Sequence, residues 1–300
     1  MASGNSGRGD RPATFHTMVS PEHDRMKGAA KAQVRRMAVE DIPAALELST
    51  EAGWNQTAED WRMLTQLAPE TCLAIYMDGE LASTTTLLCY GSSLAWLGMV
   101  LTRGKFRGQG LARRLLSETL ALANRMRIET VKLDATDQGQ PLYEKLGFRC
   151  EQPVERWERT VTGSTAILDG RSGLLSREHL VADRDSFGAD RSELLGRLAE
   201  RNGAFVAGES YAVVRPGRVT SYMGPCVSSD AGVARSLIEC CIRNTGTSLF
   251  WDLLKQNHHT ERIAIDLGFS HRRTLTRMVR GKELRGREDR IYALGGFEFG

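Results

Sequence analysis

The sequence predicts an α/β (α+β) protein built from two similar halves. Helix-like and strand-like segments alternate along most of the chain, with apolar residues at the corresponding periods. Leu142 to Phe148 (LYEKLGF) has a counterpart in Ile263 to Phe269 (IAIDLGF), and each ends a short helical pattern. A length of 300 residues allows one or two domains. The shared segment favours duplication over a chance likeness of two α/β halves.

The first half is predicted to contain a hairpin-rich sheet and one long amphipathic helix. Asp78-Gly79 is typical of a tight turn between two strands. From Leu111 onward, apolar residues form one helical stripe. The predicted elements are strands over Val34–Met37, Cys72–Met77, Glu80–Tyr90, Leu94–Thr102, Thr130–Ala135 and Phe148–Arg159, and helices over Ile42–Ser49, after a cap at Asn55 or Thr57, from Leu111, and over Gln140–Leu146.

The second half repeats this order of elements. Three strand-like runs lie within Ala204 to Val227, and a helix is predicted over Ala231 to Ile242. A strand over Ser248 to Leu253 precedes the second LGF segment. We therefore expect a disordered tail over residues 1–32, a first domain over 33–159 and a second over 160–300. The boundary is placed in the Gly/Ser/Thr-bearing stretch from Thr160 to Gly173.

Composition excludes several classes of function. A formal net charge of +3 is too small to predict binding to nucleic acid or to a membrane surface. No apolar stretch reaches the length of a membrane span, and the N-terminus lacks the apolar core of a signal peptide. The six cysteines form no CxxC pair, so we expect reduced thiols in a cytoplasmic protein. The adjacent pair His258-His259 lacks further ligands, and no metal is expected.

A glycine-rich loop joins the strand ending at Thr102 to the helix starting at Leu111. Gly108 and Gly110 let the backbone turn tightly and approach a ligand without a Cβ in the way. Backbone N–H groups at the start of a helix then suit a pyrophosphate. Arg107 and Arg113 add positive charge nearby. The loop matches neither the dinucleotide fingerprint nor a P-loop, because the GxGxxG spacing and the GK[ST] end are missing.

Three segments together resemble the GNAT acetyltransferase superfamily: Gly98 to Thr102, Phe106 to Leu116 (FRGQGLARRLL) and Leu142 to Phe148. The loop fits the family pattern Q/R-x-x-G-x-G/A through Arg107, Gly110 and Ala112. The whole chain resembles bacterial tandem GNAT proteins with a degenerate second domain. The segment Glu51 to Asn55 (EAGWN) also resembles that subgroup. The resemblance implies two tandem GNAT-like domains, each a mixed, mostly antiparallel sheet flanked by helices.

The resemblance also implies acetyl-CoA as co-substrate and a set of residues that bind it. The strand Val100-Leu101-Thr102 would separate from its neighbour and bond the pantetheine arm. The pyrophosphate would bind to the loop formed by Arg107, Gly108, Gln109, Gly110, Leu111, Ala112 and Arg113. Many members place an Asn seven residues before the catalytic Tyr, where this chain has Thr136, so a changed contact to CoA is expected.

Tyr143 is the expected general acid, and the resemblance implies direct attack by a deprotonated amine on the acetyl carbonyl. A phenol with a pKa of about 10 is protonated at neutral pH and can donate to the leaving thiolate. Backbone N–H groups of the separated strand would stabilise the oxyanion. The alternative for Tyr143 is a packed helix aromatic.

The general base is not evident, because Leu94 to Leu97 carries no acid where many relatives have one. Asp134 on the next strand is a candidate base, with a structural role or a water chain as alternatives. Trp54 and Asn55 are candidates for the acceptor pocket, or else a core aromatic and a helix cap.

The second half has lost the expected binding features. Ser228 to Gly232 replaces the loop without its arginine or paired glycines, and Ala264 stands where Tyr143 stands. We expect this half to complete the acceptor pocket without binding CoA. The predicted function is an acetyl-CoA-dependent N-acetyltransferase acting on a primary amine of a small molecule, as a monomer or homodimer. The rivals are acetylation of a protein or peptide amine, and an acetyl-CoA-binding sensor without turnover.

Overall fold

The structure is a computed structural model that describes residues 32–160, 173–246 and 248–300. The predicted tail, apart from Ala32, and most of the predicted boundary lie outside the described residues.

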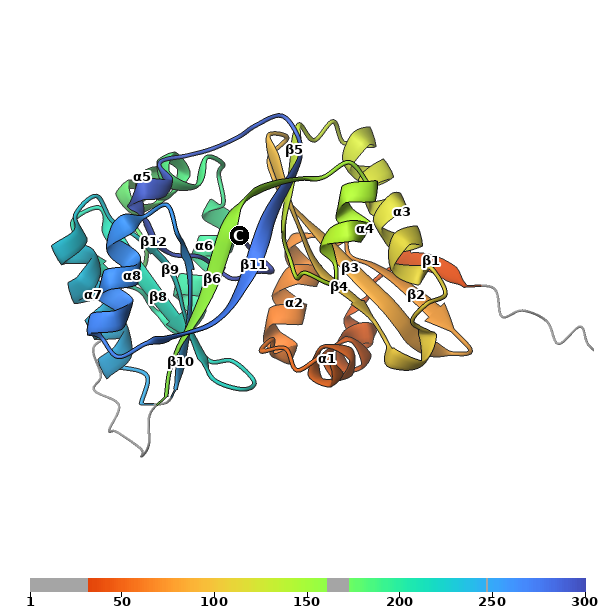
Figure 1. Cartoon of the computed structure of the whole chain (residues 1–300), viewed down its shortest axis with the longest axis horizontal. Helices are drawn as coiled ribbons and strands as arrows, with labels where there is room; N and C mark the ends of the chain where they lie inside the picture. Colours follow the sequence, from red (N-terminus) through yellow and green to blue (C-terminus); the bar gives the residue numbers. More distant parts are fainter. Residues whose placement is uncertain (1–31, 161–172, 247) are drawn as a thin grey trace, which may run out of the picture. The chain divides into compact units, whose positions relative to one another are not determined.

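The described residues of the first half form the predicted elements (Figure 1). Thr57 caps the second helix, as one of the two predicted caps, because its hydroxyl accepts from the Asp60 amide at 3.2 Å. The elements are β1 (Gln33–Arg36), α1 (Ile42–Glu51), α2 (Ala58–Leu67), β2 (Leu73–Met77), β3 (Glu80–Tyr90), β4 (Leu94–Thr102), α3 (Leu111–Arg125), β5 (Thr130–Ala135), α4 (Gln140–Lys145) and β6 (Arg149–Arg159).

The second half repeats the order of two helices, three strands, helix, strand, helix and strand. The elements are α5 (Arg177–Phe187), α6 (Ser192–Asn202), β7 (Phe205–Ala207), β8 (Ser210–Arg215), β9 (Ser221–Val227), α7 (Ala231–Arg243), β10 (Leu249–Leu254), α8 (His258–Asp266), β11 (Ser270–Gly281) and β12 (Ile291–Ala293). Helix α5 and strand β12 were not predicted from the sequence.

The two LGF segments end their helices in the same way. Gly147 and Gly268 have φ of 87° and 80°, the left-handed conformation that favours glycine after a helix. The amide of Phe148 donates to the Tyr143 carbonyl, and the amide of Phe269 donates to the Ala264 carbonyl. The repeated sequence therefore encodes a repeated local structure.

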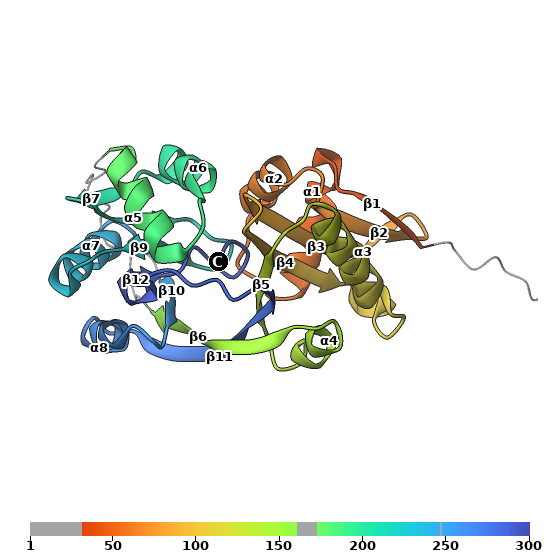
Figure 2. The same cartoon turned by 90° about the horizontal axis from the view of Figure 1, so that it is seen from above.

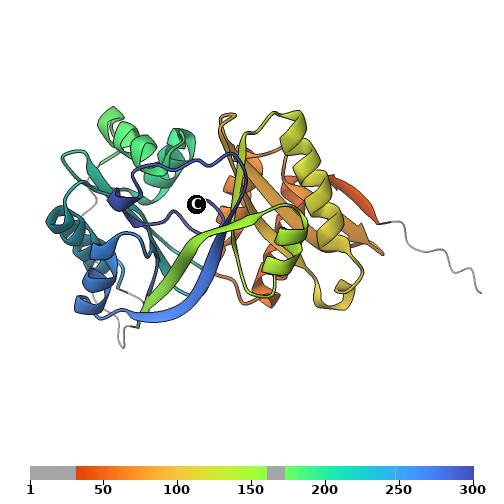
Figure 3. The same cartoon turned by 45° about the horizontal axis from the view of Figure 1, so that its top comes forward.

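The halves exchange their last strands. Strand β11 of the second half pairs antiparallel with β5 of the first, and β6 of the first pairs antiparallel with β10 of the second (Figures 1 and 3). Strands β6 and β11 also pair with each other. The described strands thereby form one mixed, mostly antiparallel sheet in the order β1-β2-β3-β4-β5-β11-β6-β10-β9-β8-β7, with β12 paired to β9. The predicted fold class is confirmed.

The halves also share a hydrophobic core. One cluster of buried side chains contains Trp61 and Leu64 from α2 together with Leu195 from α6 and Phe299. The C-terminal segment, residues 294–300, lies between the halves (Figure 2). Tyr90 donates its hydroxyl to the Phe299 carbonyl at 2.6 Å, which fixes this segment against β3.

Within the described part of the chain, every helix is too short or too polar to cross a membrane.

Candidate functional site

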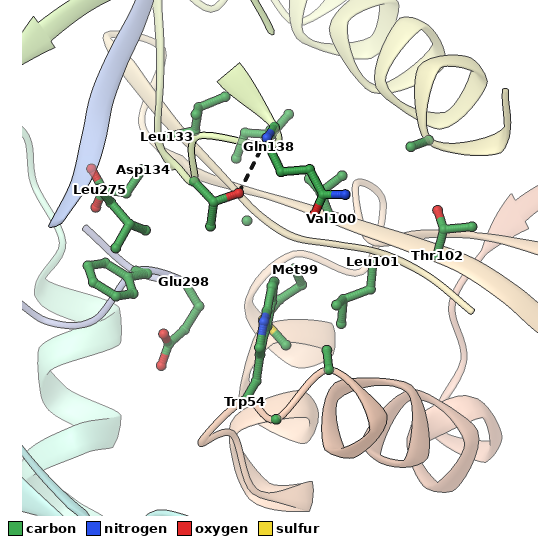
Figure 4. Close-up of a pocket in the computed structure, with 18 of the residues that line it drawn as sticks. Trp54, Met99, Val100, Leu101, Thr102, Leu133, Asp134, Gln138, Leu275 and Glu298 are labelled. Carbon is green, nitrogen blue, oxygen red and sulfur yellow. Dashed lines mark hydrogen bonds between the residues drawn. The ribbon is translucent and has the colours of Figure 1, made fainter. Parts of the chain in front are cut away.

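A cavity of about 820 Å³ is lined by residues from both halves (Figure 4). This volume falls in the range of small-molecule and cofactor sites. The first half contributes β4, the glycine-rich loop, the end of β5, α4 and the turn before α2. The second half, with the exchanged strand β6, contributes Arg156, Val219, Phe250, Arg272, Arg273, Leu275, Phe297 and Glu298.

Strands β4 and β5 separate along one edge of this cavity. They pair in parallel over Leu94–Trp96 and Thr130–Lys132, whereas β4 continues to Thr102. The described residues supply no β-strand partner for this edge of β4 beyond Trp96. Val100, Leu101 and Thr102 line the cavity there. The backbone of β4 can therefore pair with an extended ligand as a strand would.

A β-bulge lies at the same position in β4. The register with β3 shifts between the pairs Thr84–Leu101 and Thr86–Gly98, and Met99 has a φ of 50°. Thr84 donates its hydroxyl to the Met99 carbonyl at 2.8 Å and thereby holds the bulge against β3. A bulge re-aims the strand locally and ends regular pairing. It therefore contributes to the unpaired edge that faces the cavity.

The loop before α3 has the geometry of an anion site. Gly108 and Gly110 have φ of 77° and 75°, and a Cβ at either position would meet no protein atom within 4 Å. Their conformation requires glycine, but the space beside them is open. No described side chain caps α3, so its first N–H groups remain available to a ligand. All of the predicted loop residues except Gln109 line the cavity. Gln109 is exposed to solvent and is not part of the cavity lining.

Tyr143 lies on α4, and its side chain lines the cavity. Its ring packs edge-on against Phe148, with 6.0 Å between the centroids. Burial raises the pKa of Tyr143 to about 12, so its hydroxyl stays protonated over the neutral range. Thr136, predicted to contact CoA, also lines the cavity, near the turn that leads into α4.

Asp134 is held in a buried ion pair with Arg277 of the exchanged strand β11. Arg277 donates to both carboxylate oxygens, at 2.9 and 3.0 Å, and the two side chains are 0% and 3% exposed. Asp134 also lines the cavity. Its two oxygens already accept bonds from a guanidinium, an arrangement that favours the structural alternative over proton transfer.

The second half contains the matching ion pair. Arg156 lies eight residues after Phe148, as Arg277 lies eight residues after Phe269. Arg156 of the exchanged strand β6 donates to both oxygens of Asp252 on β10, at 2.7 and 2.6 Å. Each exchanged arginine therefore pairs with an aspartate on a strand of the opposite half.

Trp54 and Asn55 precede α2, and both line the cavity. The Asn55 side chain joins the halves: its amide donates to the Thr220 carbonyl at 2.9 Å, and its oxygen accepts from the amides of Val219 and Thr220. These bonds give Asn55 a structural task. Trp54 presents an indole to the cavity (Figure 4).

A buried polar cluster that the sequence did not predict lies against the same cavity. Arg215 of β8 donates to Glu298 at 2.9 Å and lies 3.8 Å from Asp60 of α2. Gln56 donates to the other oxygen of Glu298, also at 2.9 Å. Burial is the largest cause that raises the pKa of Glu298, and Asp60 adds to it while Arg215 opposes it. The only sequence feature that could have pointed to this cluster is one acid between two phenylalanines in the apolar segment Leu294 to Gly300.

The equivalent site in the second half is filled by the chain itself. Strands β9 and β10 pair in parallel over Ser221–Met223 and Leu249–Trp251 and then separate. Strand β12 occupies this gap: it pairs with the end of β9, and Trp251 of β10 donates its indole N–H to the Tyr292 carbonyl at 2.7 Å. The gap is therefore closed to an extended ligand.

In this half the start of α7 is capped by its own side chain, and a buried alanine stands at the position of the tyrosine. The Asp230 side chain accepts from the Val233 amide at 2.8 Å and caps α7 from within. Ala264, at the position of Tyr143, is fully buried. A smaller cavity of about 320 Å³ nearby includes His258 and His259. No group of three or more His, Cys, Asp or Glu that could hold a metal occurs among the described residues.

Comparisons with known proteins agree with this arrangement. Two family models, each described as an acetyltransferase (GNAT) domain, match residues 43–160 and 180–293. The chain is 24% identical over 246 residues to the uncharacterized N-acetyltransferase YitH of Bacillus subtilis strain 168, covering 77% of this chain and 85% of YitH.

Solved structures show the same fold. A candidate acetyltransferase of Pyrococcus horikoshii is 18% identical, with a TM-score of 0.80 and coverage of 93% of this chain and 99% of its own. A tandem GNAT protein from the clavulanic acid biosynthesis pathway is 13% identical, with a TM-score of 0.59 and coverage of 84% and 98%.

Proposed function

Because the chain belongs to the GNAT acetyltransferase family and carries two of its domains in tandem, we propose that it transfers an acetyl group from acetyl-CoA to a primary amine. The first half binds acetyl-CoA, and the second half completes the acceptor pocket without binding CoA. The observation that carries this proposal is which residues line one cavity. It is lined at once by the unpaired edge of β4, the open loop before α3 and Tyr143.

The proposed acetyl-CoA site uses backbone groups more than side chains. The pyrophosphate binds to the N–H groups from Gly108 to Arg113, where the helix start favours negative charge. The pantetheine arm extends along Val100 to Thr102. Thr136 lies at the end of β5 and contacts the same ligand. Gln109 is exposed, so its backbone rather than its side chain contributes to the loop.

The proposed reaction is direct attack in a complex of both substrates. The amine nitrogen forms a bond to the acetyl carbon, and backbone N–H groups of β4 stabilise the oxyanion. When the C–S bond breaks, Tyr143 donates its proton to the sulfur and later regains one from solvent. A pKa of about 12 keeps this proton on Tyr143 before the reaction. Positioning of the two substrates supplies much of the remaining rate increase.

The acceptor is proposed to be a small molecule because both halves line the cavity beside Tyr143. Val219, Phe250, Phe297 and Trp54 supply apolar surface, while Glu298 supplies a carboxylate. A long peptide acceptor would have to thread between these side chains, whereas a compact amine would not.

Acetyl-CoA binding and turnover separate this proposal from its rivals. Calorimetry should show one acetyl-CoA per chain, and a panel of small primary amines should release CoA thiol in a continuous assay. Turnover with peptide amines alone would favour the protein acetyltransferase. Tight binding of acetyl-CoA without turnover on any amine would favour the sensor. Failure to bind acetyl-CoA would overturn both the site and the function.

A further inference from the structure

The C-terminal segment brings an acid to β4, whose own sequence carries none at the expected position. Gly98 of β4 makes room for it: a Cβ there would lie 3.3 Å from both Cα and the carbonyl oxygen of Glu298. Trp96 Nε1 donates to the Phe297 carbonyl at 2.9 Å and fixes the neighbouring residue. Glu298 thus lines the cavity that also contains Met99 and Val100 (Figure 4).

The Glu298 carboxylate is held in place from several directions. Arg215 and Gln56 each donate to one of its oxygens. Gly296, with a φ of 133°, lets the side chain fold back over the backbone, since a Cβ there would lie 2.9 Å from both carboxylate oxygens. Unlike Asp134, whose two oxygens face one guanidinium, Glu298 shares its guanidinium partner with Asp60.

The guanidinium bonded to Glu298 also serves a second carboxylate. Arg215 lies beside two carboxylates, Glu298 and Asp60. Arg156 of β6 opposes the rise in the pKa of Glu298, but it is already paired with Asp252. Arg273 of β11 lines the same cavity and lies 5.3 Å from the centroid of the Phe297 ring. The neutral titratable neighbours are Tyr90 of β3 and Tyr222 of β9. A buried carboxylate that shares its guanidinium partner with a second carboxylate favours either a proton or a bound cation.

Gln56 adds an unused acceptor to the same cluster. It is 9% exposed, and its side-chain carbonyl accepts no hydrogen bond from the described residues, while its amide group donates to Glu298. An ammonium group carries a positive charge and three donors. It would supply a positive charge beside Glu298 and a donor to the Gln56 carbonyl.

We propose that Glu298 and Gln56 form the subsite for the acceptor's ammonium group, and that Glu298 takes the proton the amine must lose before attack. The acceptor is accordingly an alkyl amine that binds in its charged form. This inference rests on the proposed function and identifies the base that β4 lacks.

The proton balance is complete without another reactant. The ammonium gives one proton to Glu298 and becomes a neutral amine, whose lone pair forms the C–N bond. The nitrogen then loses a second proton to water as the C–S bond breaks, and Tyr143 protonates the sulfur. Glu298 returns its proton to solvent, and Tyr143 takes one up. The net products are the amide, CoA thiol and one proton.

Glu298→Gln tests this role because it keeps the size of the side chain and removes the charge. With an alkyl amine accepted by the wild type, kcat/KM should fall by about 100-fold or more, as expected for loss of a general base. In the wild type, the rate should fall at acid pH because the base becomes protonated. In Glu298→Gln this fall should be absent from the pH–rate profile. Acetyl-CoA affinity should stay within about threefold, which also shows that the variant folds. Glu200→Gln, at an exposed position of α6, is the matched control.

A second acceptor makes the test specific to proton removal. An arylamine is already neutral at pH 7, so its acetylation should be affected by Glu298→Gln at least tenfold less than that of an alkyl amine. Equal losses for both acceptors, or a lower melting temperature with an unchanged pH profile, would mean that Glu298 only neutralises Arg215. Such a result overturns this inference and leaves the proposed function intact. Absence of wild-type turnover on every amine, despite acetyl-CoA binding, overturns both.

Discussion

The two halves have the same framework, yet one keeps an open ligand gap and the other has filled it. In the first half, β4 and β5 separate and leave an unpaired edge beside an uncapped helix. In the second half, β12 occupies the gap between β9 and β10, and Asp230 caps the helix. The difference shows that the gap between these strands can be filled without disturbing the framework. The chain's own groups can satisfy the strand edge and the helix start that a ligand would otherwise satisfy.

The largest effect is expected from closing the open loop. Gly110→Asp should abolish measurable acetyl-CoA binding, because it places a carboxylate and a strained φ at the helix start. Isothermal calorimetry measures this directly. Gly208→Asp is the matched control, since Gly208 also has a positive φ with open space around it but lies in the second half. Normal affinity in Gly110→Asp would remove the loop from the site.

Removing the proposed acid should affect turnover without affecting binding. Tyr143→Phe should lower kcat by about 100-fold, within the usual range for general acid catalysis, and change acetyl-CoA affinity less than threefold. Because the pKa of Tyr143 is about 12, the wild-type rate should show no loss from its ionisation below about pH 10. An unchanged kcat in Tyr143→Phe would show that Tyr143 only packs against Phe148.

The duplicated ion pair tests whether Asp134 is structural. Asp134→Asn and Asp252→Asn should each lower the free energy of unfolding by about 3 kcal/mol, because each leaves a buried arginine without its partner. Urea denaturation compares the two variants. If Asp134→Asn instead abolished turnover at unchanged stability, Asp134 would regain the role of base that the sequence raised for it.

The smallest effect is expected from removing the side-chain cap of α7. Asp230→Ala removes the cap of α7 and should lower the free energy of unfolding by about 1 kcal/mol. It should not create a second acetyl-CoA site, because β12 still fills the gap. Calorimetry should still give one acetyl-CoA per chain. A stoichiometry of two would show that the cap alone closes this half.

The features that the sequence predicted correctly are local ones. The strands Glu80–Tyr90, Leu94–Thr102 and Thr130–Ala135 have their predicted bounds, because tight turns and a clear change of period mark their ends. The family and the tandem arrangement, predicted from the loop and the LYEKLGF segment, are confirmed by the two matching GNAT models.

The features that the sequence did not predict depend on partners far away in the chain. Nothing within β6 or β11 indicates that each pairs into the opposite half, since an exchanged strand has the same pattern as a resident one. Gln56 and Glu298 are 242 residues apart, and only the folded chain brings them together. The roles proposed for Glu298, Tyr143 and the loop remain predictions for the experiments above.

The strand exchange also governs when the site can form during synthesis. The first half lacks β11, Arg277 and Glu298 until residues 270–298 have been synthesised and have left the ribosome. A nascent first half therefore exposes the edge of β5 that β11 later covers, and such edges favour aggregation. Any product that ends before β11 would contain the glycine-rich loop and Tyr143, yet it would lack one wall of the cavity that they line.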